Sequence, residues 1–282
     1  LVSVHYTDDV RAYHLLKDIY LRKCYLEEKG QIDQFKTKVE LAEDLINTLL
    51  NHFPAIHEKR LTFLFDSWFL AKSIVVLLQE HDLKYVSRAK SNRKILELDM
   101  SLKEYSEQVL KASDFRKITF KRQGKLKTAF VYTTILPISK LGDVKVCFLK
   151  NDPGGKINAF LVSNNLRLSE EELINHYKER WAIETAYKDT KQYMGLDDFH
   201  VRNKKGILRH LTLSYLASSY LEYLKLLGIF NHALGNECKL STKGKQVRAY
   251  QHIVFERFLT WIDRQYENGK NLDALLTYFR RD

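Results

Sequence analysis

The sequence contains few of the residues that mark disulfide-rich, fibrous or disordered proteins. It has only 3 cysteines, 3 prolines and 11 glycines among 282 residues. Cys24, Cys147 and Cys238 lie far apart and form no Cys-x-x-Cys pair, which excludes a disulfide scaffold or a zinc ribbon and fits a reducing, intracellular setting. With 45% hydrophobic and 29% charged residues, the composition also excludes a collagenous or low-complexity chain. We therefore expect a globular protein.

Uninterrupted apolar runs of membrane-spanning length are also lacking. The most apolar late stretch, Leu211 to Ile229, contains Glu222, Lys225 and several hydroxyls, and so predicts a buried helix and no membrane span. Basic residues are in excess, because 46 Lys and Arg oppose 35 Asp and Glu and give a formal charge of +11. This excess favours a polyanion as partner, with a basic housekeeping protein as the alternative.

Up to about residue 90, strand-like and helical patterns alternate. Strands are expected at Leu1–Tyr6, Val10–Tyr20, Leu61–Phe65 and Lys84–Arg88, and helices at Phe35–Leu50 and from Asp66 to about Gln79. Asp8 and Asp9 supply turn chemistry, so the first two strands predict a β-hairpin. The later strand, helix and strand predict a βαβ unit.

From about Ser91 to Asn165 the pattern changes to β-branched and aromatic runs. The runs are Lys117–Phe120, Thr128–Ile135 and Val144–Leu149, and the breaks are Gln123-Gly124, Leu141-Gly142 and Asp152–Gly155. This segment predicts a β-rich insertion. Helix returns at Ser169, where Ser169 and Glu172 match a capping box, and continues to about Tyr193 before Gly195 ends it. Further helix is expected over Ile207–Leu227 and Tyr250–Arg280.

Four polar residues of the helix that begins at Ser169 are spaced to share one face. Arg180, Glu184 and Lys191 follow Tyr177 by three, seven and fourteen positions. At about 100° per residue, they fall at roughly −60°, −20° and −40° from it. The back of this helix is small and apolar and suited to packing on a sheet. Without further information, a solvated face with i,i+4 ion pairs is the preferred explanation of the stripe.

The spacing Tyr-x2-Arg-x3-Glu-x6-Lys resembles the signature that closes the catalytic core of the IS4-type DDE transposases. The segment from Leu64 to Phe69 resembles the family's second catalytic aspartate, here Asp66, at the end of a core strand. The resemblance extends to the segment Met194–Arg202 and spans the chain from about Leu1 to about Leu227.

The resemblance implies an α/β fold in which a ribonuclease-H-like core is interrupted by the β-rich insertion. Residues 1–90 would form the first part of the core, 91–166 the insertion, 167–228 the remainder of the core with the signature helix, and 229–282 a helical C-terminal region. The implied activity is cut-and-paste DNA transposition of an insertion sequence: metal-dependent cleavage at the transposon ends, then strand transfer to target DNA. The expected setting is the prokaryotic cytoplasm, at the nucleoid.

Two carboxylates are the expected metal ligands. Phosphodiester cleavage by two metal ions needs clustered carboxylates that hold the two ions about 3.5–4 Å apart. The expected ion is Mg²⁺ or Mn²⁺, which takes oxygen ligands. Asp66 and Glu184 are assigned to the metals, and Tyr177, Arg180 and Lys191 to the DNA phosphates. Taken alone, Asp66 is also explained as a strand-terminal turn residue or a helix N-cap. The partner that the resemblance implies is double-stranded DNA, at the transposon ends and the target. The family also implies a homodimer, but no feature of this sequence indicates the oligomeric state.

The first aspartate of the implied site is not evident. In this family it lies on the first core strand, upstream of the hairpin, and the chain begins with Leu directly in a strand-like run, so an N-terminal portion is expected to be missing. Asp8 and Asp9 are the early candidates, as hairpin-turn residues first and ligands second. The alternative function is therefore a catalytically inactive, DNA-binding transposase remnant.

Two basic clusters and two tryptophans complete the expected DNA surface. The clusters are Lys84, Arg88, Lys90, Arg93 and Lys94, and Arg202, Lys204, Lys205 and Arg209. Both clusters are suited to neutralising phosphates, and each is equally explained as a solvated face. Trp68 and Trp181 lie beside Asp66 and the signature and are candidates for stacking on an extruded base, although core positions are the more common explanation for such residues.

Overall fold

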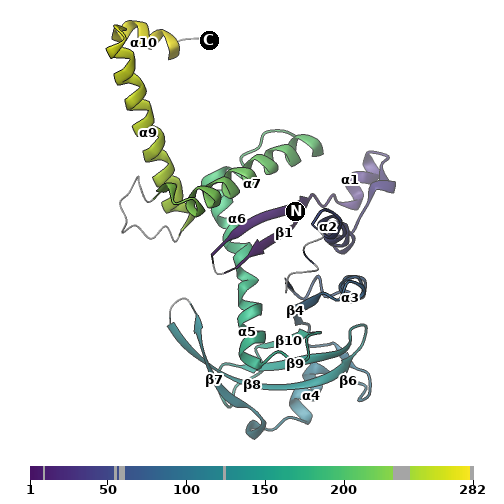
Figure 1. Cartoon of the computed structure of the whole chain (residues 1–282). Helices are drawn as coiled ribbons and strands as arrows, with labels where there is room; N and C mark the ends of the chain where they lie inside the picture. The colour runs from purple at the N-terminus through teal and green to yellow at the C-terminus, as the bar shows by residue number, and fades with distance from the viewer. Residues whose placement is uncertain (9, 54–55, 57–60, 123–124, 231–241, 280–282) are drawn as a thin grey trace. The chain divides into compact units, whose positions relative to one another are not determined.

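The computed structural model describes the chain except for residues 9, 54–55, 57–60, 123–124, 231–241 and 280–282 (Figure 1). It divides into two compact units. Unit 1 comprises Leu1–His5 and Leu15–Glu184, and unit 2 comprises Tyr6–His14 and Thr185–Asp282.

The strands are β1 Val2–Thr7, β2 Ala12–Asp18, β3 Thr62–Phe65, β4 Lys84–Ala89, β5 Lys94–Ile95, β6 Met100–Ser101, β7 Arg116–Arg122, β8 Lys125–Ile138, β9 Gly142–Lys150 and β10 Ala159–Ser163. The α-helices are α1 Lys23–Glu28, α2 Lys38–His52, α3 Lys72–Glu80, α4 Leu102–Gln108, α5 Glu170–Glu179, α6 Trp181–Met194, α7 Lys204–Leu226, α9 Lys243–Glu267 and α10 Leu272–Phe279, with short 3-10 turns at Ile32–Gln34 and Ala112–Asp114.

Most elements expected from the sequence are confirmed. β1 and β2 pair as the predicted hairpin in a sheet of their own. The predicted βαβ unit is β3, α3 and β4, and its two strands are parallel. The predicted runs of the β-rich segment lie in β7, β8 and β9, which pair antiparallel. The turn expected at Gln123-Gly124 lies outside the described residues.

One mixed sheet forms the centre of unit 1. Its eight strands run in the order β3-β4-β10-β9-β8-β5-β6, with β7 paired to β8. β3 and β4 are parallel, whereas β10 is antiparallel to both β4 and β9. Unit 1 is therefore a mixed α/β structure. That its β-rich segment is an insertion into a ribonuclease-H-like core, and the four-part domain division, remain predictions.

Alternating side chains give the sheet two apolar faces. Tyr85 of β4 packs into a core that includes residues of α2, α3 and α4. Val86, the next residue, packs on the opposite face with Leu173 and Ile174 of α5. This alternation follows from the two-residue period of a β-strand. Helix α5 is thus held on one face of the sheet, against β3, β4 and β10.

The helix predicted from Ser169 to Tyr193 is interrupted. Its start is as expected, because the Ser169 side chain and Glu172 form a reciprocal capping box. At Arg180, however, α5 ends and α6 begins, with hydrogen bonds from Arg180 N–H to the Tyr177 carbonyl and from Ile183 N–H to the Arg180 carbonyl. These i to i−3 bonds are typical of a tighter helical turn. The prediction of one continuous helix was wrong at this residue.

The prediction of a buried helix at Leu211–Ile229 was also wrong in part. One side of α7 is buried, with Leu211, Tyr215 and Glu222 among its covered residues. Leu213 and Leu216, by contrast, are more than 60% exposed. Among helices of the described residues, none is both long and apolar enough to cross a membrane.

A buried charged cluster joins α7 to α9 in unit 2. The Glu222 carboxylate accepts hydrogen bonds from Lys243 Nζ (2.8 Å), Gln246 Nε2 (2.9 Å) and Lys225 Nζ (3.0 Å). Burial raises the pKa of Glu222, but these donors outweigh it and leave the pKa below its ordinary value. Burial lowers the pKa of Lys243, which means that folding does not favour its charged form. We therefore assign the stabilising contribution of the cluster to Glu222, whose carboxylate accepts three hydrogen bonds.

This cluster predicts a pH-dependent stability. The folded-state pKa of Glu222 is lowered, so Glu222 adds to the free energy of unfolding at pH values above its unfolded-state pKa of about 4.3. This contribution is lost as the pH falls through the lower folded-state pKa. Glu222→Gln should destabilise unit 2 at neutral pH by about 3 kcal/mol, since Lys243 stays buried without its counter-charge. Urea unfolding followed by circular dichroism should show this loss, and the difference from wild type should shrink towards about pH 3. The exposed Glu256→Gln is the matched control; an equal loss in both variants would contradict the assignment.

Candidate functional site

Asp66 lies at the carboxyl end of β3, the strand at one edge of the mixed sheet. Along β3, Phe63 and Phe65 pack towards α2 and α3, whereas Leu64 packs into the cluster that contains α5 residues. Asp66 is the first residue after β3 and lies two positions beyond Leu64, the β3 residue on the face that carries α5.

The Asp66 carboxylate also has a local structural role. Its Oδ1 accepts a hydrogen bond from the Trp68 backbone N–H at 2.8 Å, and its carbonyl accepts one from Phe69. Asp66 is thus a strand-terminal turn residue, one of the two alternatives considered for it. It is not a helix N-cap, because α3 begins at Lys72 with Ala71 in the capping position.

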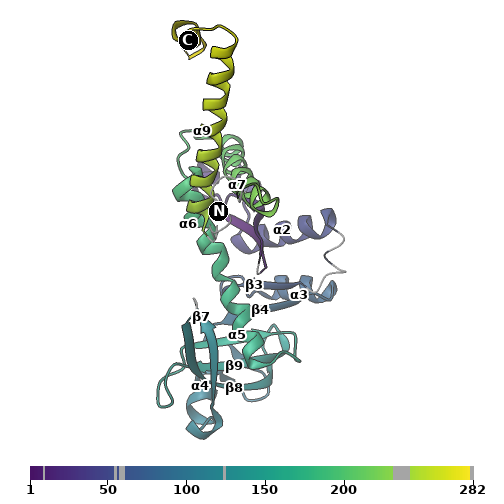
Figure 2. The same ribbon diagram turned by 60° about the vertical axis from the view of Figure 1, so that its left-hand side comes forward.

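Helix α5 crosses the sheet towards β3 (Figure 2). At its N-terminal end, Glu170 accepts a hydrogen bond from Thr133 of β8. Near its C-terminal end, Tyr177 packs in the same apolar cluster as Leu64. The helix therefore spans from the middle of the sheet to the edge strand that carries Asp66. Arg180 and Glu184 follow Tyr177 by one and two helical turns.

Tyr177, Arg180 and Glu184 lie close together in unit 1. An Arg180 guanidinium nitrogen donates to Glu184 Oε1 at 2.6 Å, and the guanidinium carbon lies 5.6 Å from the Tyr177 ring centre. Burial lowers the pKa of Arg180, but the hydrogen bond to Glu184 and the neighbouring Tyr177 raise it overall, so the guanidinium stays charged. Arg180 is mostly buried, whereas 43% of the Glu184 side chain is exposed. The i,i+4 pair expected on this helix face is present.

Lys191 belongs to unit 2, where its Nζ lies 2.9 Å from an Asp197 carboxylate oxygen. The one-face prediction assumed an unbroken helix; the helix is interrupted at Arg180, and the placement of Lys191 on the same face stays a prediction. Asp197 was not singled out by the sequence, because it follows Gly195 in a turn where helical spacing no longer applies.

The carboxylates present are of the right chemical kind for a divalent cation. Asp66 and Glu184 offer oxygen atoms of the type that Mg²⁺ takes, and each already has one oxygen in a hydrogen bond within the protein. Within the described ranges, no cluster of three or more His, Cys, Asp or Glu side chains is suited to hold a metal. Among these residues, Asp66 and Glu184 therefore belong to no group of three such side chains.

Asp8 is occupied by the hairpin turn. Its carboxylate accepts hydrogen bonds from the Tyr6 hydroxyl (2.8 Å) and from the backbone N–H groups of Val10 (2.8 Å) and Arg11 (2.6 Å). Burial raises the pKa of Asp8, but these donors bring it below its ordinary value. Its expected role as a turn residue is confirmed, and Asp9 lies outside the described residues.

The two tryptophans near the signature are on the surface, so the core interpretation was wrong for both. Trp68 is 74% exposed, and the Lys90 ammonium lies over its ring at 4.9 Å from the centre. Trp181 is 50% exposed, and the Arg180 guanidinium lies 5.6 Å from its ring centre. The sequence carried no signal for the Lys90 contact, because a cation and a ring 22 positions apart follow no helical or strand spacing.

The basic cluster that begins in β4 and extends to Lys94 is largely engaged within the protein. Lys84 pairs with Asp82, Lys94 with Asp99, and the Arg88 guanidinium donates to the Asn158 carbonyl. In the second cluster, Arg202, Lys205 and Arg209 are exposed around the start of α7. The second cluster is therefore the better candidate for contacts with phosphates.

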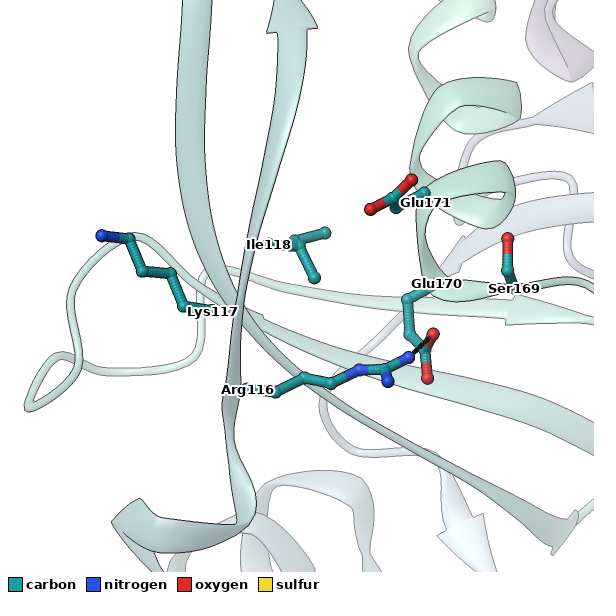
Figure 3. Close-up of a pocket in the computed structure, with 6 residues that line it drawn as sticks. All are labelled: Arg116, Lys117, Ile118, Ser169, Glu170 and Glu171. Carbon is teal, nitrogen blue, oxygen red and sulfur yellow. Dashed lines mark hydrogen bonds and ion pairs between the residues drawn. The ribbon is translucent and has the colours of Figure 1, made fainter.

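A separate pocket of about 350 Å³ lies at the other end of α5 (Figure 3). Its lining residues are Arg116, Lys117, Ile118, Ser169, Glu170 and Glu171. Arg116 and Glu170 form an ion pair across it, and Ser169 is occupied as the helix cap. None of the predicted site residues lines it, so we do not assign the site to this pocket.

Comparison with known proteins supports the family suggested by the sequence. Among curated proteins, no match is found. The family model described as the transposase DDE domain matches residues 36–220, a range that contains Asp66, Tyr177, Arg180, Glu184 and Lys191. Since this match covers more than half of the chain, the protein belongs to the DDE transposase family.

Proposed function

We propose that this protein is the transposase of an IS4-type insertion sequence, which cleaves double-stranded DNA at the transposon ends and transfers the freed strand to target DNA. The observation that carries the proposal is the placement of α5. The helix packs on the sheet face shared by Leu64 and contacts β3, and Asp66 is the residue that follows β3, whereas Glu184 lies one turn beyond the end of α5. We further propose a ribonuclease-H-like core for this arrangement.

Asp66 and Glu184 are the proposed metal-holding carboxylates. Bound divalent cations, Mg²⁺ or Mn²⁺, would supply activation of the attacking oxygen and stabilisation of the leaving oxygen. The chain's own contribution is to orient the two carboxylates. Trp68 N–H fixes one Asp66 oxygen, and Arg180 fixes one Glu184 oxygen while counterbalancing its charge.

Arg180, Tyr177 and Lys191 are the proposed phosphate contacts. A guanidinium bonded on one side to a carboxylate keeps further N–H donors for a phosphate, and Arg180 has such donors. Tyr177 would add its hydroxyl. Lys191 would exchange its exposed ion pair with Asp197 for a phosphate, at little cost because exposed pairs contribute roughly 0–1 kcal/mol.

Trp68 is the proposed stacking surface for a DNA base. It is the most exposed aromatic side chain beside Asp66, and Lys90 over its ring adds a positive charge suited to the neighbouring phosphate. The proposed setting of this reaction is the nucleoid of a prokaryotic cell. The alternative function is that of an inactive DNA-binding remnant, and the cleavage test distinguishes it from an active transposase.

The cleavage test uses plasmid DNA that carries the sequences flanking the gene. We expect nicking that depends on Mg²⁺ or Mn²⁺ and falls by at least about 100-fold in Asp66→Asn and Glu184→Gln, because each change removes a charged metal ligand. Glu171→Gln, an exposed carboxylate on the same helical segment, should leave the rate unchanged. DNA binding without nicking in either metal would contradict the proposal and support the remnant.

Stacking is tested with Trp68→Ala. Because Trp68 is exposed, its removal should leave the unfolding midpoint unchanged while weakening binding of single-stranded and nicked DNA by roughly 5- to 150-fold, the effect of about 1–3 kcal/mol per stacked base. Fluorescence anisotropy of labelled oligonucleotides measures the affinity. Trp181→Ala is the comparison variant, because it removes the other exposed tryptophan near the signature and shows whether that ring also contributes to DNA affinity. Unchanged affinity in Trp68→Ala would exclude the stacking role.

A further inference from the structure

A two-stranded ribbon extends from the mixed sheet where β7 meets the start of β8 (Figure 1). Pairing of β8 with β9 begins at Phe130, so among the described residues the stretch from Lys125 to Ala129 pairs with β7 alone. We call the segments Lys117–Arg122 and Lys125–Phe130 the β7–β8 ribbon. It belongs to unit 1, and β8 is the one strand that pairs with β7 in the described part of the sheet. Two strands of this ribbon therefore stand beside each other without a third.

The charge of the ribbon is of one sign. From Phe115 to Gly142 the sequence has no Asp or Glu, whereas the whole chain has 35 in 282 residues. Basic residues are frequent in the same stretch: Arg116, Lys117, Lys121, Arg122, Lys125, Lys127 and Lys140. All but Lys140 lie in β7 or in the first residues of β8. The ribbon is thus a third basic segment, separate from the two basic clusters described above.

One face of the ribbon is covered by α5. Ile118, Phe120 and Ala129 pack in the apolar cluster that contains Leu173 of this helix. The Lys178 ammonium of α5 lies over the Phe120 ring, 3.6 Å from its centre. These contacts hold the ribbon beside the C-terminal half of α5, where Lys178 follows Tyr177 of the signature.

The other face of the ribbon is exposed. Side chains alternate between the two faces of a strand, and Lys117, Thr119, Leu126 and Thr128 lie on the side away from α5, all of them exposed. Figure 3 shows the start of this alternation, with Ile118 directed towards the helix and Lys117 away from it. Thr119 and Thr128 are direct partners across the two strands, and Leu126 is 70% exposed. We call these four residues the outer face.

Charge on an unpaired strand edge also protects a sheet from pairing with other chains. That role is served by charge of either sign, and it gives no reason for a Leu that is 70% exposed on the same ribbon. Binding of a polyanion accounts for the single sign of the charge, and a polyanion with apolar groups accounts for the exposed Leu126 as well.

Double-stranded DNA fits this ribbon in shape and in charge. The major groove of B-form DNA is about 12 Å wide and admits a two-stranded β-ribbon. Its two walls are lined with phosphates, which match basic residues on both strands of the ribbon. Hydroxyls such as those of Thr119 and Thr128 hydrogen-bond to base edges, and an apolar side chain such as Leu126 contacts the thymine methyl group.

Two other polyanions fit less well. Double-stranded RNA has a deep, narrow major groove that side chains do not reach. An acidic strand of another protein, added along one edge of the ribbon, would leave the basic residues of the other strand unmatched.

We propose that the β7–β8 ribbon binds double-stranded DNA in the major groove, with the outer face towards the base edges and basic side chains along the phosphate walls. The inference rests on the proposed function for the identity of the partner, and it adds a DNA contact that needs no metal. Because the ribbon is held beside the C-terminal half of α5, it binds DNA next to the helix end that carries Tyr177.

DNA binding by the full chain, measured by fluorescence anisotropy in EDTA over a series of salt concentrations, tests this inference. The ribbon variant Lys117→Gln, Lys127→Gln removes one exposed charge from each strand. It should weaken binding of a labelled 20-base-pair DNA at least about 10-fold in 0.1 M salt and lower the slope of log affinity against log salt by about 1.8, the effect of two phosphate contacts.

The control variant Lys103→Gln, Lys140→Gln has the same net charge as the ribbon variant. Lys103 lies in α4 and Lys140 in the turn that follows β8, and both are exposed. It should bind DNA within about two-fold of wild type. Circular dichroism and the unfolding midpoint should be unchanged in both variants, because all four lysines are exposed.

The groove is tested with dimethyl sulfate, which methylates guanine N7 in the major groove. Wild-type protein should protect guanines from methylation, and the ribbon variant at equal occupancy should not. Double-stranded RNA of the same sequence should bind wild type and the ribbon variant equally, within about two-fold.

Four outcomes would overturn the proposal: no DNA binding by wild type in EDTA, equal weakening in the control variant, no protection of guanine N7, or the same loss of affinity for RNA as for DNA. If the ribbon variant does not fold, hydrogen exchange of wild type decides. Amide exchange in residues 117–122 should slow when DNA is added, while that in 102–108 stays constant, and exchange in 117–122 that ignores DNA would also overturn it. Because no metal is present, failure here leaves the proposed cleavage standing, and loss of cleavage leaves this binding standing.

Discussion

The packing of α5 on the mixed sheet is the interaction on which the candidate site depends. Leu173 and Ile174 bury themselves against Val86 and Leu161, and Tyr177 reaches the cluster that contains Leu64. This contact fixes where the helix ends relative to β3. If it loosened, the end of α5 would lose its position relative to the edge strand, while Asp66 would stay in its turn. The family match to residues 36–220 spans both partners of this contact.

The tighter turn at Arg180 separates two roles within one signature. Residues before it are held by the sheet, and Arg180 itself is held by Glu184 and by the rings of Tyr177 and Trp181. Residues after Glu184 belong to unit 2, whose own stability rests on the buried Glu222 cluster between α7 and α9. The signature is therefore assembled from a helix packed on a sheet, a local ion pair, and a lysine paired with Asp197 in the turn after α6.

The sequence was sufficient for the regular elements and for the local pairing of site residues. Alternation predicted the hairpin and βαβ unit, and i,i+4 spacing predicted the Arg180–Glu184 pair, because these features depend on neighbours in the chain. The sequence did not reveal the turn at Arg180, the exposure of Trp68 or the uncovered side of α7. These features depend on which surfaces meet after folding. The sequence pattern around a Leu or Trp is the same whether the folded chain covers that side chain or leaves it exposed. The pairing of Lys191 with Asp197 was missed for the same reason.

The central claim is that Asp66 and Glu184 act on the same bound cation. A double-mutant cycle on Mn²⁺ affinity, measured by electron paramagnetic resonance with wild type, Asp66→Asn, Glu184→Gln and the double variant, tests it most directly. If the two carboxylates share a cation, the double variant should bind no more weakly than the weaker single variant, with a coupling free energy above about 1 kcal/mol. Strictly additive losses, or Mn²⁺ binding unaffected by both changes, would show that the two side chains do not form one site.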